Sequence, residues 1–216
     1  MTNPNESQRP TFPAQPLEND IWQGNASRKA VAFTFDVEGY TDIELPCILD
    51  LLDEYSSKGT FFIQGAWAQT NPDQLRDIVR RGHAIGNHSW SHKDMVHMDD
   101  SEIATELQST EIVVQEIAGV TTKPYWRCPL GSRDAHLLEV VDNLGYLHGW
   151  LSARADPRDG DDPEIAVQFS LSRARNGTIY LYHPRILGVC SVIREVMQKL
   201  NSGGYAFHTL QQISAN

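Results

Sequence analysis

The sequence predicts an α/β fold in which parallel strands alternate with helices. Short runs rich in β-branched and aromatic residues alternate with segments of helical periodicity from residue 30 to residue 210. Polar residues gather directly after several apolar runs, at the strand ends where such folds bind ligands. The length of 216 residues, with 40% hydrophobic and 21% charged residues, fits a single globular domain.

Strands and helices can be assigned in order along the chain. The expected strands are 30–35, 59–63, 83–89, 125–129, 146–153, 177–183 and 205–210. The expected helices are 43–55, 72–82, 101–119, 136–145, 163–174 and 192–204. For the helix at 101–119, the acidic start predicts Asp100 or Ser101 as the N-cap. An open doubly wound sheet and a closed (β/α) barrel both fit this alternation, which does not separate them.

The N-terminal region differs in composition from the rest. Residues 1–29 are polar and contain prolines at positions 4, 10, 13 and 16, which predicts an arm that lies on or off a catalytic domain at 30–216. The first twenty residues have neither a basic n-region nor an apolar h-region, so a cytoplasmic location is expected, with secretion as the alternative if a leader has been removed. The formal net charge of -10, without a cluster of Lys and Arg, argues against nucleic acid or an anionic membrane as a partner.

The pattern of cysteines and glycines argues against a disulfide-rich protein and against a nucleotide-binding protein. Cys47, Cys128 and Cys190 are too few and too scattered for a disulfide framework, and they form no C-x-x-C pair. We expect them to be small buried apolar residues. No Gly-rich phosphate loop occurs, which gives no basis for nucleotide binding. No apolar run is long enough to span a membrane.

The first strand ends in two acids, in the stretch FTFDVEGY at residues 33–40. Side chains alternate between the faces of a strand, so Asp36 and Glu38 would converge on one site and Val37 would point to the opposite face. An acidic strand end followed by a turn would give the same letters. The choice between chemistry and packing therefore depends on the rest of the chain.

The segment NHSWSH places His88 and His92 four residues apart, directly after an expected strand. This spacing brings two imidazoles within reach of one ion. Two histidines and one carboxylate are a common catalytic zinc set, with the remaining coordination position held by water. The other histidines lack partners at such spacing and are expected on the surface or in packing: His83, His97, His136, His148 and His208.

Several motifs occur in a fixed order between residues 30 and 213. TFDVEGY is followed by a helix and GTFFI, then by RRGHAIGNHSWSH, RCPLG at 127–131 and LYH at 181–183. In this order the chain resembles the polysaccharide deacetylases, whose catalytic unit is the NodB homology domain. Their fourth motif, D-x-x-D-W, is matched in part by DPRDG at 156–160. The resemblance implies a distorted (β/α) barrel of seven strands, of the glycoside hydrolase and deacetylase type.

The resemblance also implies an activity, the metal-dependent removal of an N-acetyl group from an amino sugar. Asp36 would be the general base and Arg127 would orient it. His183 would be the general acid, with Asp159 as its tuning partner. A backbone N–H, that of Leu130, would stabilise the developing oxyanion together with the metal.

For the metal, the resemblance implies His88 and His92 as ligands. The position that usually holds the third ligand is occupied by Val37, so Glu38 takes that role, as in a branch of the superfamily with a D-x-E first motif. The longer Glu side chain would offset the displacement. The metal would be Zn²⁺, with Co²⁺, Ni²⁺ or Mn²⁺ as alternatives.

A second departure concerns the substrate pocket. Gly160 stands where the fourth motif has Trp, so Trp126, Trp150 or Trp90 would supply the apolar wall, or the pocket is wider. Leu130 replaces an aromatic residue, which indicates a substrate other than a long sugar polymer.

Two rival functions stay open beside the deacetylase. One is a hydrolase of cyclic amides, such as ureides or imides, in the same superfamily. The other is a barrel that binds glycans without turning them over. A sugar or a small-molecule amide is the expected partner in the enzymatic cases, and the sequence leaves the oligomeric state open.

Overall fold

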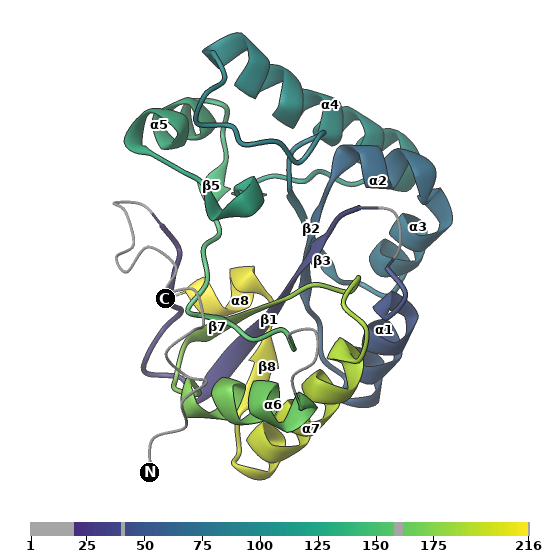
Figure 1. Ribbon diagram of the computed structural model, residues 1–216, viewed down its shortest axis with the longest axis vertical. Coiled ribbons are helices and arrows are strands. Elements are labelled where there is room, and N and C mark those ends of the chain that lie inside the picture. Colours follow the sequence, from purple (N-terminus) through teal and green to yellow (C-terminus); the bar gives the residue numbers. More distant parts are fainter. Residues whose placement is uncertain (1–19, 40–41, 158–161, 216) are drawn as a thin grey trace.

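The computed structural model describes residues 20–39, 42–157 and 162–215. Within these residues, eight strands form one sheet in which all pairings are parallel (Figure 1). The strands are β1 (Ala30–Val37), β2 (Thr60–Ile63), β3 (Ala84–Asn87), β4 (Tyr125–Trp126), β5 (Leu147–His148), β6 (Ala153–Arg154), β7 (Thr178–Tyr182) and β8 (Ala206–His208). Their order is β5-β4-β3-β2-β1-β7-β6, and β8 pairs with the first residues of β1.

The sheet curls into a distorted barrel, which confirms the predicted fold class. The seven strands of the main path match the expected number, and β8 is an addition beside β1. The strand expected at 146–153 is instead two short strands, because residues 149–152 cross directly from β5 at one end of the path to β6 at the other. Gly149 lies in this link, where an added Cβ would come within 2.8 Å of the Phe62 ring. Only glycine lets the link approach the barrel interior so closely.

Most helices cover the outside of the sheet, whereas α8 packs on the other side through Leu210 and Ile213. Helices α6 and α7 pack side by side (Figure 1). The helices are α1 (Leu45–Glu54), α2 (Gly65–Thr70), α3 (Pro72–Arg80), α4 (Asp100–Ala118), α5 (Ala135–Asn143), α6 (Pro163–Ser172), α7 (Val189–Ser202) and α8 (Leu210–Ser214). The N-cap of α4 is Asp99, not Asp100 or Ser101, because Asp99 and Glu102 form a reciprocal capping box. Among the described residues, no helix has the length and apolar character needed to cross a membrane.

Strand β1 is buried along its whole length and separates two layers of the core. Phe33, Phe35 and Val37 pack into the apolar layer beneath the helices. Ala32 contributes to a second cluster, on the other side of the sheet. Asp36 and Glu38 line a pocket on that second side. The two acids therefore share one face, as their spacing predicts.

Residues 20–29 lie on the barrel, although the sequence assigns them to an arm. The Ile21 N–H donates to the carbonyl of His148 at 2.9 Å, and the Gly24 N–H donates to the carbonyl of Gly177 at 2.8 Å. The packed structure therefore begins before residue 30. Residues 1–19 of the predicted arm lie outside the described residues.

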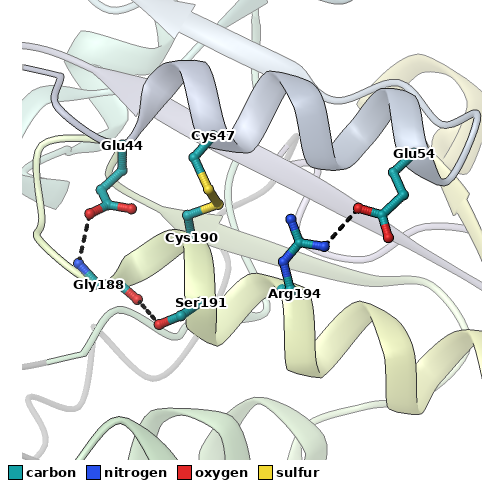
Figure 2. Close-up of a disulfide and its surroundings, with 7 residues drawn as sticks. All are labelled: Glu44, Cys47, Glu54, Gly188, Cys190, Ser191 and Arg194. Atoms are coloured by element: carbon teal, nitrogen blue, oxygen red, sulfur yellow. Dashed lines mark hydrogen bonds and ion pairs between the residues drawn. A yellow bond between two sulfur atoms is a disulfide. The ribbon is translucent and has the colours of Figure 1, made fainter.

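A disulfide joins Cys47 on α1 to Cys190 on α7, with the two Cα atoms 6.1 Å apart (Figure 2). The expectation of three unpaired cysteines is therefore wrong for this pair. It holds for Cys128, which is free and buried, and burial raises the pKa of its thiol to about 12. The bonded cysteines are 143 residues apart in the sequence, so only the folded chain brings them together.

The disulfide predicts both a thiol count and a stability effect. One thiol should react in the unfolded, unreduced chain and three after reduction, because only Cys128 is free. Reduction should lower the free energy of unfolding by ~2–5 kcal/mol, since it releases a long closed loop in the unfolded chain. Urea unfolding with and without reductant measures this difference. In the control, Cys47→Ser combined with Cys190→Ser, stability should not respond to reductant. Equal stability of the oxidised and reduced wild type would contradict the prediction.

Candidate active site

A pocket opens at the carboxyl ends of the parallel strands, and the loops that follow β1, β3, β4 and β7 supply most of its lining. Because parallel strands end at the same edge, motifs far apart in the sequence meet there. The predicted site residues that line this pocket are Asp36, Glu38, His88, His92, Arg127, Leu130 and His183.

Arg127 is buried to 1% exposure and holds the floor of the pocket together. Its Nη1 donates to Asp36 Oδ1 and to Thr34 Oγ1, both at 2.9 Å. Its Nε and Nη2 donate to the carbonyls of Gly149 and Trp150 at 2.8 and 3.0 Å. Its guanidinium also lies 4.1 Å from the centre of the Phe62 ring, a cation–π distance. These contacts fix the guanidinium and thereby the position of Asp36.

Asp36 has one oxygen bound to Arg127 and the other facing two imidazoles. Its Oδ2 lies 3.7 Å from His88 Nε2 and 3.8 Å from His183 Nε2. Burial acts to raise the pKa of Asp36, but the charges of Arg127, His88 and His183 outweigh it and hold the pKa below its usual range. The carboxylate is therefore ionised at neutral pH.

Glu38, His88 and His92 form a cluster suited to a metal ion. Glu38 Oε2 lies 3.2 Å from His88 Nε2 and contacts His92 Nε2. One ligand atom from each residue falls within 4.8 Å of the other two. His88 Nδ1 donates to the Arg127 carbonyl at 2.9 Å, and this bond directs the opposite nitrogen toward the acid. Two imidazole nitrogens and a carboxylate fit a divalent metal such as zinc.

The loop that carries the two histidines is held in an unusual conformation. Ser89 and His92 have positive φ angles of 61° and 56°, a region that non-glycine residues rarely adopt. The Glu106 carboxylate on α4 accepts hydrogen bonds from the N–H groups of Trp90 and Ser91 at 2.8 and 2.7 Å. It also accepts from the Ser91 hydroxyl at 2.7 Å. Sequence reasoning missed Glu106, since no local pattern links it to this loop.

His183 is oriented by Asp156. The His183 N–H donates to Asp156 Oδ1 at 2.8 Å, and its ring Nδ1 lies 2.7 Å from Asp156 Oδ2. Nε2 is then left facing Asp36. The sequence prediction gave this partner role to Asp159, which lies outside the described residues. The partial match DPRDG found the right segment, and its first acid, Asp156, contacts the histidine.

Trp150 is the tryptophan that lines the pocket. Of the other two candidates, Trp126 is fully buried in the core, and Trp90 covers Gly65, where a Cβ would lie 2.4 Å from the indole. Leu130 stands at the pocket mouth with 66% of its surface exposed and a φ of 59°.

A buried ion pair braces Trp150 from the side. The Arg133 guanidinium lies 3.8 Å from the centre of the Trp150 ring. Asp20 Oδ2 accepts from Arg133 Nη2 at 2.6 Å, and Asp20 Oδ1 lies 2.5 Å from His148 Nδ1. The side chains of Asp20 and Arg133 are 0% and 2% exposed, so each charge depends on the other. A residue of the predicted arm thus supports the wall of the pocket.

Fold and site together define a class of protein, a (β/α) barrel with an arginine-held acid, a histidine–acid pair and a two-histidine carboxylate cluster. The polysaccharide deacetylase family profile matches residues 23–148. The chain belongs to the polysaccharide deacetylase family.

One known relative illustrates the relationship in both sequence and structure. Peptidoglycan-N-acetylmuramic acid deacetylase PdaA of Bacillus subtilis is 29% identical over 196 residues, which cover 89% of this chain and 74% of PdaA. The solved structure of PdaA, a family 4 carbohydrate esterase, superposes with a TM-score of 0.83 at 28% identity, covering 90% of this chain and 84% of that one.

A family 4 pseudoenzyme from Bacillus anthracis shares the fold equally well. Its TM-score is 0.83 at 23% identity, over 91% of this chain and 69% of that chain. This likeness concerns the fold alone. Activity must therefore be argued from side chains at the strand ends.

Replacing Asp20 should cost more stability than replacing an exposed acid. Asp20→Asn leaves the Arg133 guanidinium buried without a counter-charge, so we expect a loss of ~3–5 kcal/mol in the free energy of unfolding. Urea unfolding measures it. The control is Asp73→Asn, because Asp73 is 94% exposed in its pair with Arg76 and should change stability by at most ~1 kcal/mol. Similar losses in both variants would contradict the prediction.

Proposed function

We propose that the protein removes an N-acetyl group from an amino sugar of a glycan, using a divalent metal held by Glu38, His88 and His92. The observation that carries the proposal is the convergence of this cluster, the Arg127–Asp36 pair and the His183–Asp156 pair in one pocket. PdaA, a family relative, is named for deacetylation of N-acetylmuramic acid in peptidoglycan. The side chains of the pocket and the activity in the name of PdaA support the same type of reaction.

Asp36 acts as the general base in this proposal. A bound metal supplies Lewis-acid polarisation of the acetamide carbonyl and lowers the pKa of a water towards ~7. Asp36 Oδ2, free of Arg127, takes the proton of the attacking water. Arg127 keeps the carboxylate ionised and its Oδ1 fixed, so the base needs no rearrangement before reaction.

His183 acts as the general acid. The Asp156 carboxylate holds Nδ1 and favours a proton there, while Nε2 faces the pocket and delivers a proton to the departing amine. Trp150 forms the apolar wall beside the acetyl methyl group, and the Leu130 N–H stabilises the oxyanion. Asp156 is the partner of His183 in this proposal, and Asp159, the partner implied by the sequence, lies outside the described residues.

The rival functions have less support. Hydrolases of cyclic amides often lack a full metal set, whereas Glu38, His88 and His92 all offer ligand atoms within 4.8 Å of one another. A barrel that only binds glycans would have no use for a base and an acid held by separate buried partners.

The disulfide bears on location. Disulfides form and persist in oxidising environments and are rare in the cytosol. The Cys47–Cys190 bond therefore supports a protein that works in an oxidising compartment, instead of the cytoplasmic location expected from the sequence. Such a location would also give it access to cell-surface glycans.

Metal content should separate the roles of Asp36, in β1, and Glu38, directly after it. The purified protein should hold about one divalent metal per chain, because three ligands form an open site. Glu38→Gln should weaken the affinity for zinc strongly, since a neutral amide is a poor ligand, while Asp36→Asn should keep the metal and lose turnover. Elemental analysis and acetate release on N-acetylglucosamine oligomers, with and without a chelator, measure both effects.

Val37→Ala is the matched control for this experiment. Its side chain packs on the opposite face, so the variant should keep the metal and lose ~1–3 kcal/mol of stability. Metal loss in Asp36→Asn with full metal in Glu38→Gln would reverse the two roles. If Asp36→Asn and Glu38→Gln both keep the full metal content, the proposed metal site that uses one of these two carboxylates is wrong. Ring opening of a cyclic ureide without acetate release would favour the cyclic-amide function.

A separate test addresses His183, the proposed general acid. His183→Ala should leave the metal bound and lower turnover by ~10²-fold or more, the usual effect of a lost general acid. Steady-state kinetics and metal analysis on the same sample provide the measurement. His136→Ala, at a histidine that is 58% exposed, is the control and should have no effect. Loss of metal together with turnover would make His183 a ligand.

A further inference from the structure

Two arginines that sequence reasoning did not single out line the mouth of the pocket. Arg185 follows His183 by two residues, and Arg154 ends β6. Their side chains are 41% and 37% exposed, unlike the buried Arg127. They therefore meet solvent and any ligand that enters the pocket.

Each of these arginines is anchored to a carboxylate of the site. Arg185 Nε donates to Glu38 Oε1 at 2.9 Å, the oxygen on the side away from the histidines. Arg154 Nε donates to Asp156 Oδ2 at 3.1 Å. For Arg185, no described residue accepts a hydrogen bond from Nη1 or Nη2. An anchored guanidinium with free terminal N–H groups is preorganised to bind a second, planar or tetrahedral anion.

The charge balance of the pocket differs from that of the protein. The carboxylates of Asp36, Glu38 and Asp156 balance the guanidinium groups of three arginines. A divalent cation on the metal cluster then makes the pocket net positive, although the chain has a formal net charge of -10. A positive cleft in an acidic protein attracts anions and turns away cations.

We propose that Arg185, supported by Arg154, binds an anionic group carried by the N-acetylated sugar, either a carboxylate or a phosphate. The inference rests on the proposed deacetylase function and narrows its substrate class. Leu130 at the pocket mouth offers no aromatic face on which a neutral sugar could stack. Ionic contacts from the arginines then contribute to substrate recognition in place of stacking at this position.

The test compares acetate release from three substrates by the metal-loaded protein. They are di-N-acetylchitobiose, which is neutral, N-acetylmuramic acid, which carries a carboxylate, and N-acetylglucosamine 1-phosphate. In the wild type, kcat/KM for one or both anionic substrates should exceed that for the neutral one by ~10-fold or more, and the ratio should fall with added salt. The more active of the two anionic substrates identifies the source of the charge.

Variants separate anion binding from a merely structural role. Arg185→Met should bring the ratio of anionic to neutral kcat/KM down ~10-fold or more, mainly through KM, while Arg185→Lys should retain part of the preference. Arg194→Met, which removes one positive charge on α7 outside the pocket, should leave the ratio unchanged (Figure 2). Metal content is measured throughout. If Arg185→Met loses the metal, the same comparison is made with Arg154→Met, because Arg154 is anchored to Asp156 and not to a proposed metal ligand.

Each outcome of these measurements either supports or overturns the anion-binding proposal. Equal kcat/KM on neutral and anionic substrates in the wild type, or an equal fall on all substrates in Arg185→Met, would overturn the proposal. If no substrate releases acetate, the deacetylase function fails, and calorimetric titration with N-acetylglucosamine 1-phosphate and N-acetylglucosamine decides this inference. Tighter binding of the phosphate that disappears in Arg185→Met would support it, and equal binding would overturn it.

Discussion

The buried Arg127 guanidinium is the interaction on which the rest of the site depends. It bonds to the Asp36 carboxylate of β1 and to the two carbonyls of the link between β5 and β6. Its own carbonyl accepts the His88 ring proton. One residue therefore sets the position of the acid, the tautomer of a histidine in the metal cluster and the path of the link that carries Trp150. A buried charge is costly unless it is fully hydrogen-bonded, which explains why so many partners surround it.

The parts of the structure that repeat or alternate could be predicted from the sequence. Alternating strand and helix patterns predicted parallel strands with helical connections, and only the family resemblance favoured the barrel over an open sheet. The i, i+2 spacing predicted that Asp36 and Glu38 face the same side. The spacing of His88 and His92 likewise predicted that they lie together. These predictions worked because each depends on local geometry and on the rule that parallel strands end at one edge.

The parts that depend on distant pairs could not be predicted. The Cys47–Cys190 bond, the Asp20–Arg133 pair and the Glu106 contacts each join segments whose proximity only the packed chain decides. The Asp156–His183 contact was also not predicted, because the partial motif assigned a role only to Asp159, which lies outside the described residues. Long-range polar contacts carry no periodic signal in the sequence.

A barrel of this kind does not guarantee catalysis, as the pseudoenzyme from Bacillus anthracis with nearly the same backbone indicates. What distinguishes an active barrel is the set of side chains at the strand ends and the partners that hold them. In this chain, Arg127 holds Asp36 through its guanidinium and His88 through its carbonyl, while Asp156 holds His183. These contacts keep a carboxylate and two imidazoles in fixed orientations within one small volume.

The Asp20 contact also constrains the order in which the site can assemble. Asp20 lies 113 residues before Arg133 and 128 residues before His148. Ribosomes add ~5–20 residues per second, so this carboxylate waits on the order of ten seconds before either partner has been synthesised. Asp20 therefore reaches its final position well after its own synthesis. The wall beside Trp150 therefore cannot form on a nascent chain that stops short of β5, because His148 and Trp150 both follow α5 in the sequence.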